Sequence, residues 1–137
     1  MVDLPNNYRP RKNEKYMNEK QQQYFRLKLQ AWRNELLDES KQTVERLRGE
    51  TVEVGDEADR ANRESDHALE LRTRDRYRKL IGKIDQALLR VDDGTYGFCE
   101  ETGEPIGIQR LEVRPVAILS VEAQERRELL QKKIHVA

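Results

Sequence analysis

The chain has 137 residues, of which 38% are charged, 36% are hydrophobic and 6% are aromatic. This apolar share is too small for a thick globular core and suits long exposed helices, so we expect one domain or a compact domain with one extended element. The 26 basic and 26 acidic residues cancel, which argues against a protein that binds mainly to the phosphate backbone of nucleic acid.

The apolar runs and the cysteine content predict a soluble, cytoplasmic protein. No apolar run approaches the roughly 20 residues that cross a bilayer, and the first five residues contain no apolar core of a secretory signal. Cys99 is the single cysteine, which excludes an intrachain disulfide framework.

The N-terminal part predicts an arm followed by a long helix. Residues 1–12 contain Pro5 and Pro10 and are interpreted as a flexible or loosely docked segment. The helical pattern begins near Asn13, and we assign residues 1–17 to an arm that packs on or near the globular part. Apolar residues then recur at steps of four and three, which is typical of a two-helix coiled coil. The residues of this stripe are Phe25, Leu29, Trp32, Leu36 and, more weakly, Ser40, Val44 and Leu47.

A second helix is predicted after a turn at about residues 50–60, where glycine and acidic residues interrupt the periodicity. It runs from about Asp59 to Val91, roughly 48 Å at 1.5 Å per residue, and ends before Gly94. Its apolar positions are Leu80, Ile84, Ala87, Leu88 and Val91. Because helices joined by a short turn run antiparallel, residues 18–93 predict an antiparallel coiled coil with an acidic tip.

Residues 94–137 predict a degenerate zinc ribbon followed by a helix. Cys99 and Thr102 occupy the spacing of one Cys-x2-Cys pair, and Ser120 and Ala123 occupy that of a second. A structural zinc ion needs four nitrogen or sulfur ligands, so we expect no metal here. Ser120 is also placed to cap a helix from about Val121 to His135.

Turns and short strands held by apolar packing are expected between residues 94 and 119. For Cys99 we favour a buried, inert thiol over a reactive one. The side chains expected to pack are Tyr96, Phe98, Ile106, Ile108, Leu111, Val116 and Ile118.

The charged clusters leave two interpretations open. The acidic tip is either a solvated turn or a set of carboxylates that reaches a metal or basic groups in a partner's cavity. Arg76, Lys79 and Lys83 share one helical face, which is either solvated or part of a phosphate site with Arg114. The sequence contains no P-loop or dinucleotide fingerprint and no nucleophile–base pair, so an enzyme is not expected.

Over residues 14 to about 130 the chain resembles the DksA/TraR zinc-finger family of bacterial transcription factors. The matching pieces are Glu14-Lys15-Tyr16-Met17-Asn18-Glu19, Ala31-Trp32-Arg33-Asn34, Asp59-Arg60-Ala61, Leu69-Glu70-Leu71-Arg72, Arg74-Asp75-Arg76, Lys79-Leu80-Ile81, Tyr96-Gly97-Phe98-Cys99-Glu100, Ile106-Gly107-Ile108 and Arg110-Leu111-Glu112-Val113-Arg114-Pro115. The resemblance implies a mainly α fold, in which a long antiparallel two-helix coiled coil is joined to a small degenerate zinc-ribbon-like domain with a C-terminal helix.

The resemblance also implies a function in the stringent response. A member of this family binds bacterial RNA polymerase, inserts its coiled coil into the secondary channel and acts with ppGpp as co-effector, lowering rRNA promoters and raising amino-acid biosynthesis promoters. We therefore expect a monomer with no tightly bound cofactor, no zinc, no sequence-specific DNA binding and no membrane association. The residues implied are Asp59, Ala61 and Asp56 at the tip, Arg76 at the polymerase rim, and Leu80, Lys83 and Arg114 at the ppGpp site.

One further basic contact of the ppGpp site falls on Gln124, so nucleotide coupling is expected to be weaker. Two other classes remain as alternatives. A Gre-like factor would use its tip carboxylates at the magnesium site of the polymerase to promote transcript cleavage. A plain coiled-coil adaptor would have no role at the polymerase.

Overall fold

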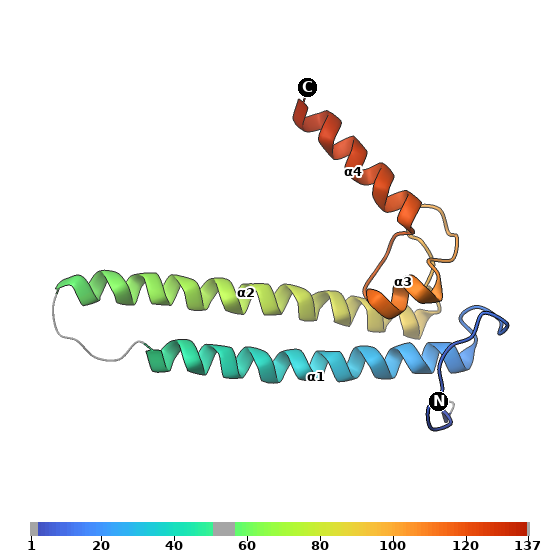
Figure 1. Cartoon of the computed structure of the whole chain (residues 1–137), viewed down its shortest axis with the longest axis horizontal. Helices are drawn as coiled ribbons and strands as arrows, with labels where there is room; N and C mark the ends of the chain where they lie inside the picture. Colours follow the sequence, from blue (N-terminus) through green and yellow to red (C-terminus); the bar gives the residue numbers. More distant parts are fainter. Residues whose placement is uncertain (1–2, 51–56, 137) are drawn as a thin grey trace. The chain divides into compact units, whose positions relative to one another are not determined.

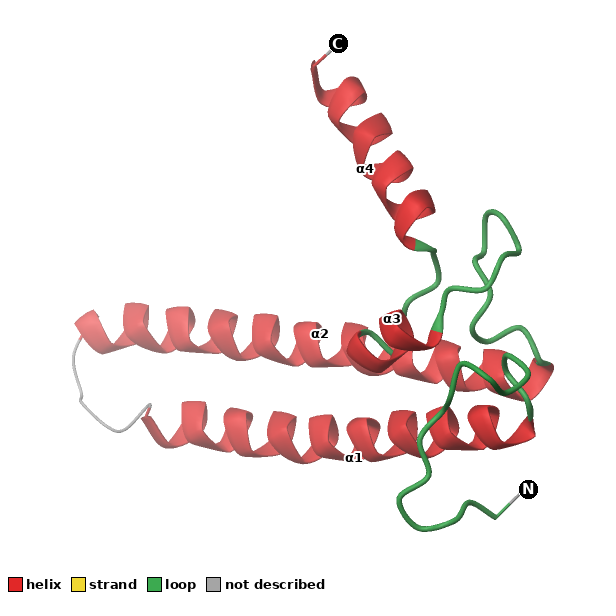
Figure 2. Cartoon of the chain, turned by 45° about the vertical axis from the view of Figure 1, so that its right-hand side comes forward, coloured by secondary structure: helices red, strands yellow, loops and turns green. Residues whose placement is uncertain are grey.

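The computed structural model describes residues 3–50 and 57–136, and this part of the chain forms four helices (Figure 1). They are α1 (Glu19–Glu50), α2 (Glu57–Asp93), α3 (Ile108–Val113) and α4 (Val121–Val136). Only helices and loops occur among the described residues (Figure 2), so the prediction of a mainly α fold is confirmed. None of these helices combines the length and the apolar character that a membrane crossing requires.

The structure divides into two compact units, and each is described by itself. The first unit consists of Met1–Leu29 and Gln86–Ala137, and the second consists of Gln30–Asp85. Helices α1 and α2 each contribute residues to both units.

In the second unit, the segments of α1 and α2 lie side by side and run in opposite directions (Figures 1 and 2). Arg33 Nε lies 2.6 Å from Asp85 Oδ1, and Arg48 Nη2 lies 2.9 Å from Glu70 Oε1. The step from Arg33 to Arg48 is 15 residues forward on α1, and that from Asp85 to Glu70 is 15 residues back on α2. This register confirms the predicted antiparallel pairing.

A narrow apolar seam joins the two helices of the second unit. Leu36 and Val44 are buried on α1, and Tyr77 and Ile84 are buried on α2. The predicted spacing identified three of these residues. The fourth, Tyr77, was not predicted, because the charged residues on both sides of it in the sequence give no sign of a buried position.

The first unit has a thicker core around Tyr96. The Tyr96 ring lies 5.6 Å from that of Phe25, and its hydroxyl donates to the Pro115 carbonyl oxygen over 2.8 Å. A buried tyrosine hydroxyl needs such a partner. The other core side chains include Leu29, Ala87, Val91, Leu111, Ala117, Leu119 and Ala123.

Residues 96–107, called the hairpin below, reverse the chain after α2. The Cys99 amide donates to the Glu104 carbonyl oxygen (2.7 Å), and the Ile106 amide donates to the Gly97 carbonyl oxygen (2.8 Å). The short strands predicted in this region are reduced to one isolated bridge, because the ladder contains too few such bonds to extend further.

Two boundaries differ from the sequence-based expectation. Helix α1 begins at Glu19 rather than near Asn13. Met17 adopts a left-handed backbone conformation (φ 52°), and the Asn18 side chain accepts a hydrogen bond from the Gln21 amide (2.9 Å). This N-cap fixes the start of the helix.

Residues 108–113 form helix α3 where turns and short strands were expected. Leu111 is completely buried, whereas Val113 is 87% exposed. Leu111 is the buried residue of this six-residue helix. A segment this short contains too few apolar positions for their spacing to distinguish a helix from a strand. Phe98, expected to pack inside, is 36% exposed.

Candidate functional site

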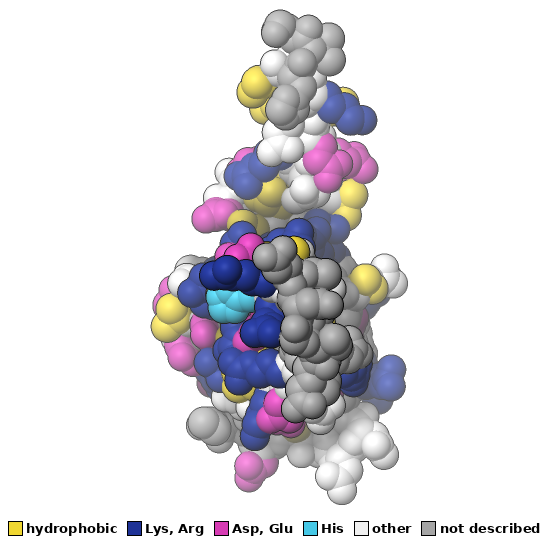
Figure 3. Space-filling model, turned by 90° about the vertical axis from the view of Figure 1, so that its left-hand side faces the viewer, with side chains coloured by type: hydrophobic (Ala, Val, Ile, Leu, Met, Phe, Trp, Pro, Cys, Tyr) yellow, Lys and Arg dark blue, Asp and Glu magenta, His cyan; other side chains and the backbone are white. Residues whose placement is uncertain are grey.

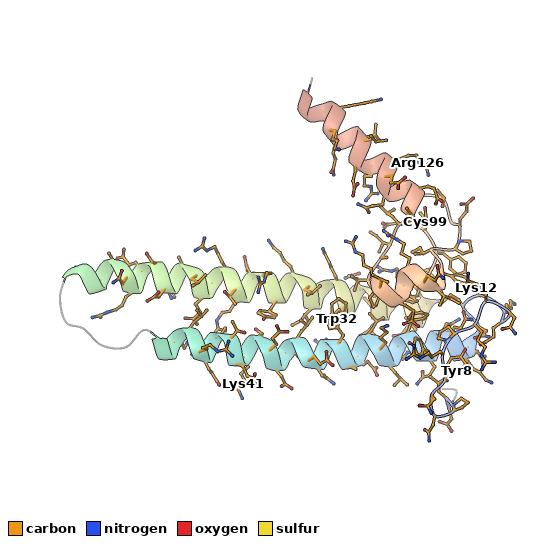
Figure 4. All side chains as sticks on the ribbon, in the orientation of Figure 1. Tyr8, Lys12, Trp32, Lys41, Cys99 and Arg126 are labelled. Carbon is orange, nitrogen blue, oxygen red and sulfur yellow. The ribbon has the colours of Figure 1, made fainter. Side chains whose placement is uncertain are left out.

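The four positions of the degenerate zinc ribbon lie in the first unit. Cys99 and Thr102 belong to the hairpin, and Ser120 and Ala123 lie at the beginning of α4. Cys99, Ser120 and Ala123 are buried. Figure 4 labels Cys99 near the first turn of α4.

Cys99 is a buried free thiol, as predicted. Burial raises the pKa of this thiol, but hydrogen bonds from the Thr102 hydroxyl and from the backbone amides of Ser120, Thr102 and Glu101 outweigh burial and lower the pKa to about 6. Amides that surround a sulfur atom in this way stabilise a thiolate. The sulfur therefore has hydrogen-bond donors as neighbours.

The other three positions do not supply metal ligands. Ser120 Oγ accepts a hydrogen bond from the Ala123 amide (3.2 Å) and caps α4, as the sequence predicts. Thr102 Oγ1 accepts from the Glu104 amide (3.2 Å), and Ala123 has no donor atom. One thiol with two hydroxyls and a methyl group does not fit a tetrahedral zinc site.

Other possible metal ligands lie apart from one another in the described structure. Within residues 3–50 and 57–136, no three His, Cys, Asp or Glu side chains gather closely enough to hold a metal ion. In the described structure, backbone hydrogen bonds and packing against the arm hold the hairpin.

Tyr16 supplies one such connection between the arm and the hairpin. Its hydroxyl donates to the Gly97 carbonyl oxygen (2.6 Å) and accepts from the Gly107 amide (3.0 Å). Its ring meets Phe98 edge to face at 5.5 Å. A Cβ atom at Gly97, where φ is +89°, would lie 2.9 Å from Met17 Cγ, so the close approach of the arm requires glycine there.

Sequence reasoning missed this role of Tyr16. The available signal was a tyrosine followed by an apolar residue, Met17, in an otherwise polar arm. That signal gives no indication of which distant backbone groups the hydroxyl would reach.

The predicted tip residues are only partly covered by the described structure. Asp56 lies outside the described residues. Asp59 belongs to the first turn of α2, but its side chain lies outside the described part of the chain. Ala61, in the next turn, is exposed.

The predicted rim residue, Arg76, is exposed on α2. Its guanidinium carbon lies 5.4 Å from the centre of the Tyr77 ring, a distance that permits a cation–π interaction. Lys79 and Lys83 are exposed on the same helix. On the face shown in Figure 3, Lys and Arg side chains gather around a histidine.

The predicted ppGpp residues come from both units. Leu80 is half-buried and Lys83 is exposed in the second unit, whereas Arg114 is exposed in the first. The Arg114 amide donates to the Arg110 carbonyl oxygen and closes α3 (2.7 Å). Gln124, at the position of the missing cation, donates through its side chain to Glu128 (3.1 Å).

Comparison with known proteins gives consistent results over nearly the whole chain. Residues 21–91 match the family described as DnaK suppressor protein DksA, N-terminal domain, and residues 94–129 match the prokaryotic dksA/traR C4-type zinc finger. The RNA polymerase-binding transcription factor DksA of Caulobacter vibrioides strain NA1000 / CB15N is 61% identical over 128 residues, which cover 93% of this chain and 89% of the relative.

Two further relatives agree. The RNA polymerase-binding transcription factor DksA of Escherichia coli strain K12 is 45% identical over 127 residues, covering 93% of this chain and 84% of that protein. The solved structure of transcription factor DksA2 from Pseudomonas aeruginosa has a TM-score of 0.76 and 45% identity, covering 85% of this chain and 90% of the other. The chain therefore belongs to the DksA/TraR family, with one cysteine at the positions of its C4-type zinc finger.

Proposed function

We propose that this chain is a transcription regulator that binds bacterial RNA polymerase. The observation that carries the proposal is the 61% identity, over 93% of the chain, to a protein named RNA polymerase-binding transcription factor DksA. The match to the DksA N-terminal domain spans both Asp59 and Arg76. The relatives give no support to the transcript-cleavage alternative or to a plain adaptor.

The coiled coil of the second unit is the element that enters the secondary channel of the polymerase. Asp59 and Ala61, with Asp56, act at the active centre, and Arg76 anchors α2 at the channel rim. Support comes from the exposure of Ala61 and Arg76 and from the narrow seam, which leaves most charged side chains of both helices available to a partner.

The regulator acts with ppGpp in the stringent response, through Leu80, Lys83 and Arg114 together with the polymerase. It lowers transcription from rRNA promoters and raises it from amino-acid biosynthesis promoters. Gln124 is uncharged and hydrogen-bonded to Glu128, so one cation fewer faces the nucleotide and coupling is weaker.

The proposed regulator is active without zinc. The side-chain oxygen atoms of Thr102 and Ser120 each accept a hydrogen bond from a backbone amide, so they do not act as metal ligands. The chain acts in the cytoplasm as a monomer. It performs no chemistry of its own and recognises no DNA sequence directly.

Transcription in vitro tests this function. With purified polymerase and an rRNA promoter, with and without ppGpp, Asp59→Asn is expected to reduce inhibition at least about tenfold, because the carboxylate charge at the active centre is lost. Polymerase affinity stays within about twofold, a change of under about 0.5 kcal/mol. On an amino-acid biosynthesis promoter, the unmodified chain is expected to raise transcription in the same assay.

Asp66→Asn on the same helix is the matched control and keeps full inhibition. If Asp59→Asn no longer bound polymerase, the proposal that Arg76 anchors the chain while Asp59 acts at the active centre would be contradicted. Failure of the unmodified chain to bind polymerase would overturn the proposed function itself.

A further inference from the structure

Arg114 lies in the first unit, in a segment whose backbone is bonded on both sides. It follows α3 in a non-helical conformation, with φ −136° and ψ 81°. Its amide donates to the Arg110 carbonyl oxygen (2.7 Å), and the next carbonyl oxygen, that of Pro115, accepts from the Tyr96 hydroxyl (2.8 Å). The Arg114 backbone is therefore held in place. Its exposed side chain forms no ion pair within the described part of the chain.

The C-terminal end of α3 is bound by Lys28 of α1. The Lys28 ammonium donates to the Glu112 carbonyl oxygen (3.1 Å) and to Glu112 Oε2 (2.6 Å). The Glu112 carbonyl is one of the last four of α3, which have no partner inside the helix, and a lysine ammonium is a suitable donor to such a group. Lys28 therefore caps α3 although it lies 84 residues away in the sequence.

A second donor from α1 fixes the same carboxylate. The Tyr24 hydroxyl donates to Glu112 Oε2 over 3.1 Å, and Lys28 Nζ lies 6.0 Å from the centre of the Tyr24 ring. The side chains of Lys28 and Glu112 are 33% and 31% exposed, so water screens their attraction less than it screens a fully exposed pair. Tyr24, Lys28 and Glu112 thus form one polar connection between α1 and the end of α3.

We propose that Lys28 and Glu112 are positioning residues that orient Arg114 toward the phosphate groups of ppGpp. Glu112 precedes Arg114 by two residues, so a shift of the Glu112 backbone changes the direction in which the guanidinium points. A guanidinium binds phosphate oxygens through two parallel hydrogen bonds, which depend on its orientation. Lys28 acts through Arg114, because its own ammonium is bonded to Glu112. This role rests on the proposed function, in which ppGpp is the ligand of Arg114.

Inhibition of an rRNA promoter by the full chain, titrated with ppGpp, tests the proposal. In Lys28→Met the ppGpp concentration for half-maximal effect is expected to rise at least about threefold, because fewer molecules hold Arg114 in the competent orientation. Inhibition without ppGpp is expected to stay unchanged. Lys28→Arg restores the response, since a guanidinium can also donate to both Glu112 oxygens. The matched control is Lys20→Met, because Lys20 is an exposed residue of α1 without an ion pair in the described part of the chain.

A double-mutant cycle with Arg114→Ala separates an indirect role of Lys28 from a direct one. In the Arg114→Ala background, Lys28→Met is expected to cause no further rise in the half-maximal ppGpp concentration. Full additivity of the two substitutions would overturn the proposal, because Lys28 would then act independently of Arg114. Equal loss of inhibition with and without ppGpp in Lys28→Met would also overturn it, since that result indicates a general structural defect.

Amide hydrogen exchange followed by NMR examines the same connection in the full chain without polymerase. In Lys28→Met the Arg114 amide is expected to exchange at least about fivefold faster, because the end of α3 opens more often. The Ile106 amide, which bonds to Gly97 in the hairpin, keeps its rate. An unchanged Arg114 rate, or a normal ppGpp response of Lys28→Met, would overturn the positioning role alone. If the unmodified chain did not respond to ppGpp, the proposed function would fail and the positioning role with it.

Discussion

The two units differ in how they are held together. The first contains most of the buried apolar side chains of the described structure, around Tyr96, Phe25 and Leu111. Within the described residues, the second buries only four apolar side chains, which form the seam between its helices. The first unit therefore contains most of the buried apolar core, whereas most charged side chains of the second unit are exposed.

Exposed ion pairs occur in both units, but the first unit also contains a buried polar contact. In the first unit the Tyr96 hydroxyl bonds to a backbone oxygen inside the core, where loss of a partner is expensive. In the second unit, side-chain exposure is 37% for Arg33 and 47% for Asp85. Exposed ion pairs of this kind contribute under about 1 kcal/mol each, so they set the register more than the stability.

The largest effect is expected from Leu111→Ala in the first unit. Leu111 is completely buried, so its truncation leaves a cavity and lowers the free energy of unfolding by about 3 kcal/mol. Urea unfolding followed by circular dichroism measures the loss. Val113→Ala in the same helix is the control, because Val113 is 87% exposed, and it changes the value by under about 0.5 kcal/mol. Equal losses would refute the assigned core.

The same substitution in the second unit sharpens the comparison. Leu36→Ala is expected to lower the free energy of unfolding by about 2 kcal/mol, at the low end for a buried leucine. The reason is that solvent borders a two-helix seam and the neighbours can close part of the cavity. Leu37→Ala is the control, since Leu37 is 44% exposed. A loss larger than that of Leu111→Ala would reverse the assigned order of the two units.

A smaller effect is expected from Tyr16→Phe, which tests the connection between arm and hairpin. The variant keeps the ring against Phe98 but removes the hydroxyl that bonds Gly97 and Gly107. The free energy of unfolding should fall by about 1 to 2 kcal/mol, because the Gly107 amide loses its partner. Thermal unfolding measures the change. A Tyr16→Phe protein as stable as the unmodified chain would show that the hydroxyl makes no net contribution.

The long helices were predictable because their apolar spacing extends over many turns. On α2, for example, Leu80, Ile84 and Leu88 recur every four residues, and a pattern that extends over many turns has few alternative interpretations. The N-cap role of Ser120 was predictable for a different reason, since a cap depends only on neighbouring backbone amides.

The contacts of Tyr16 escaped prediction because they join residues that are distant in sequence. The partners of the Tyr16 hydroxyl lie 81 and 91 residues away, and no local pattern encodes them. Helix α3 was missed because six residues are too few for a periodic signal.

In the proposed function, the first unit folds through its core and its hydrogen bonds without a metal ion. Thermal unfolding before and after dialysis against a chelator tests it most directly. A variant carrying Thr102→Cys, Ser120→Cys and Ala123→Cys, loaded with zinc, shows that the assay detects a metal contribution. The midpoint of the natural chain is expected to stay unchanged, because the first unit binds no metal in this proposal. A midpoint that falls on chelation and recovers with stoichiometric zinc would contradict it.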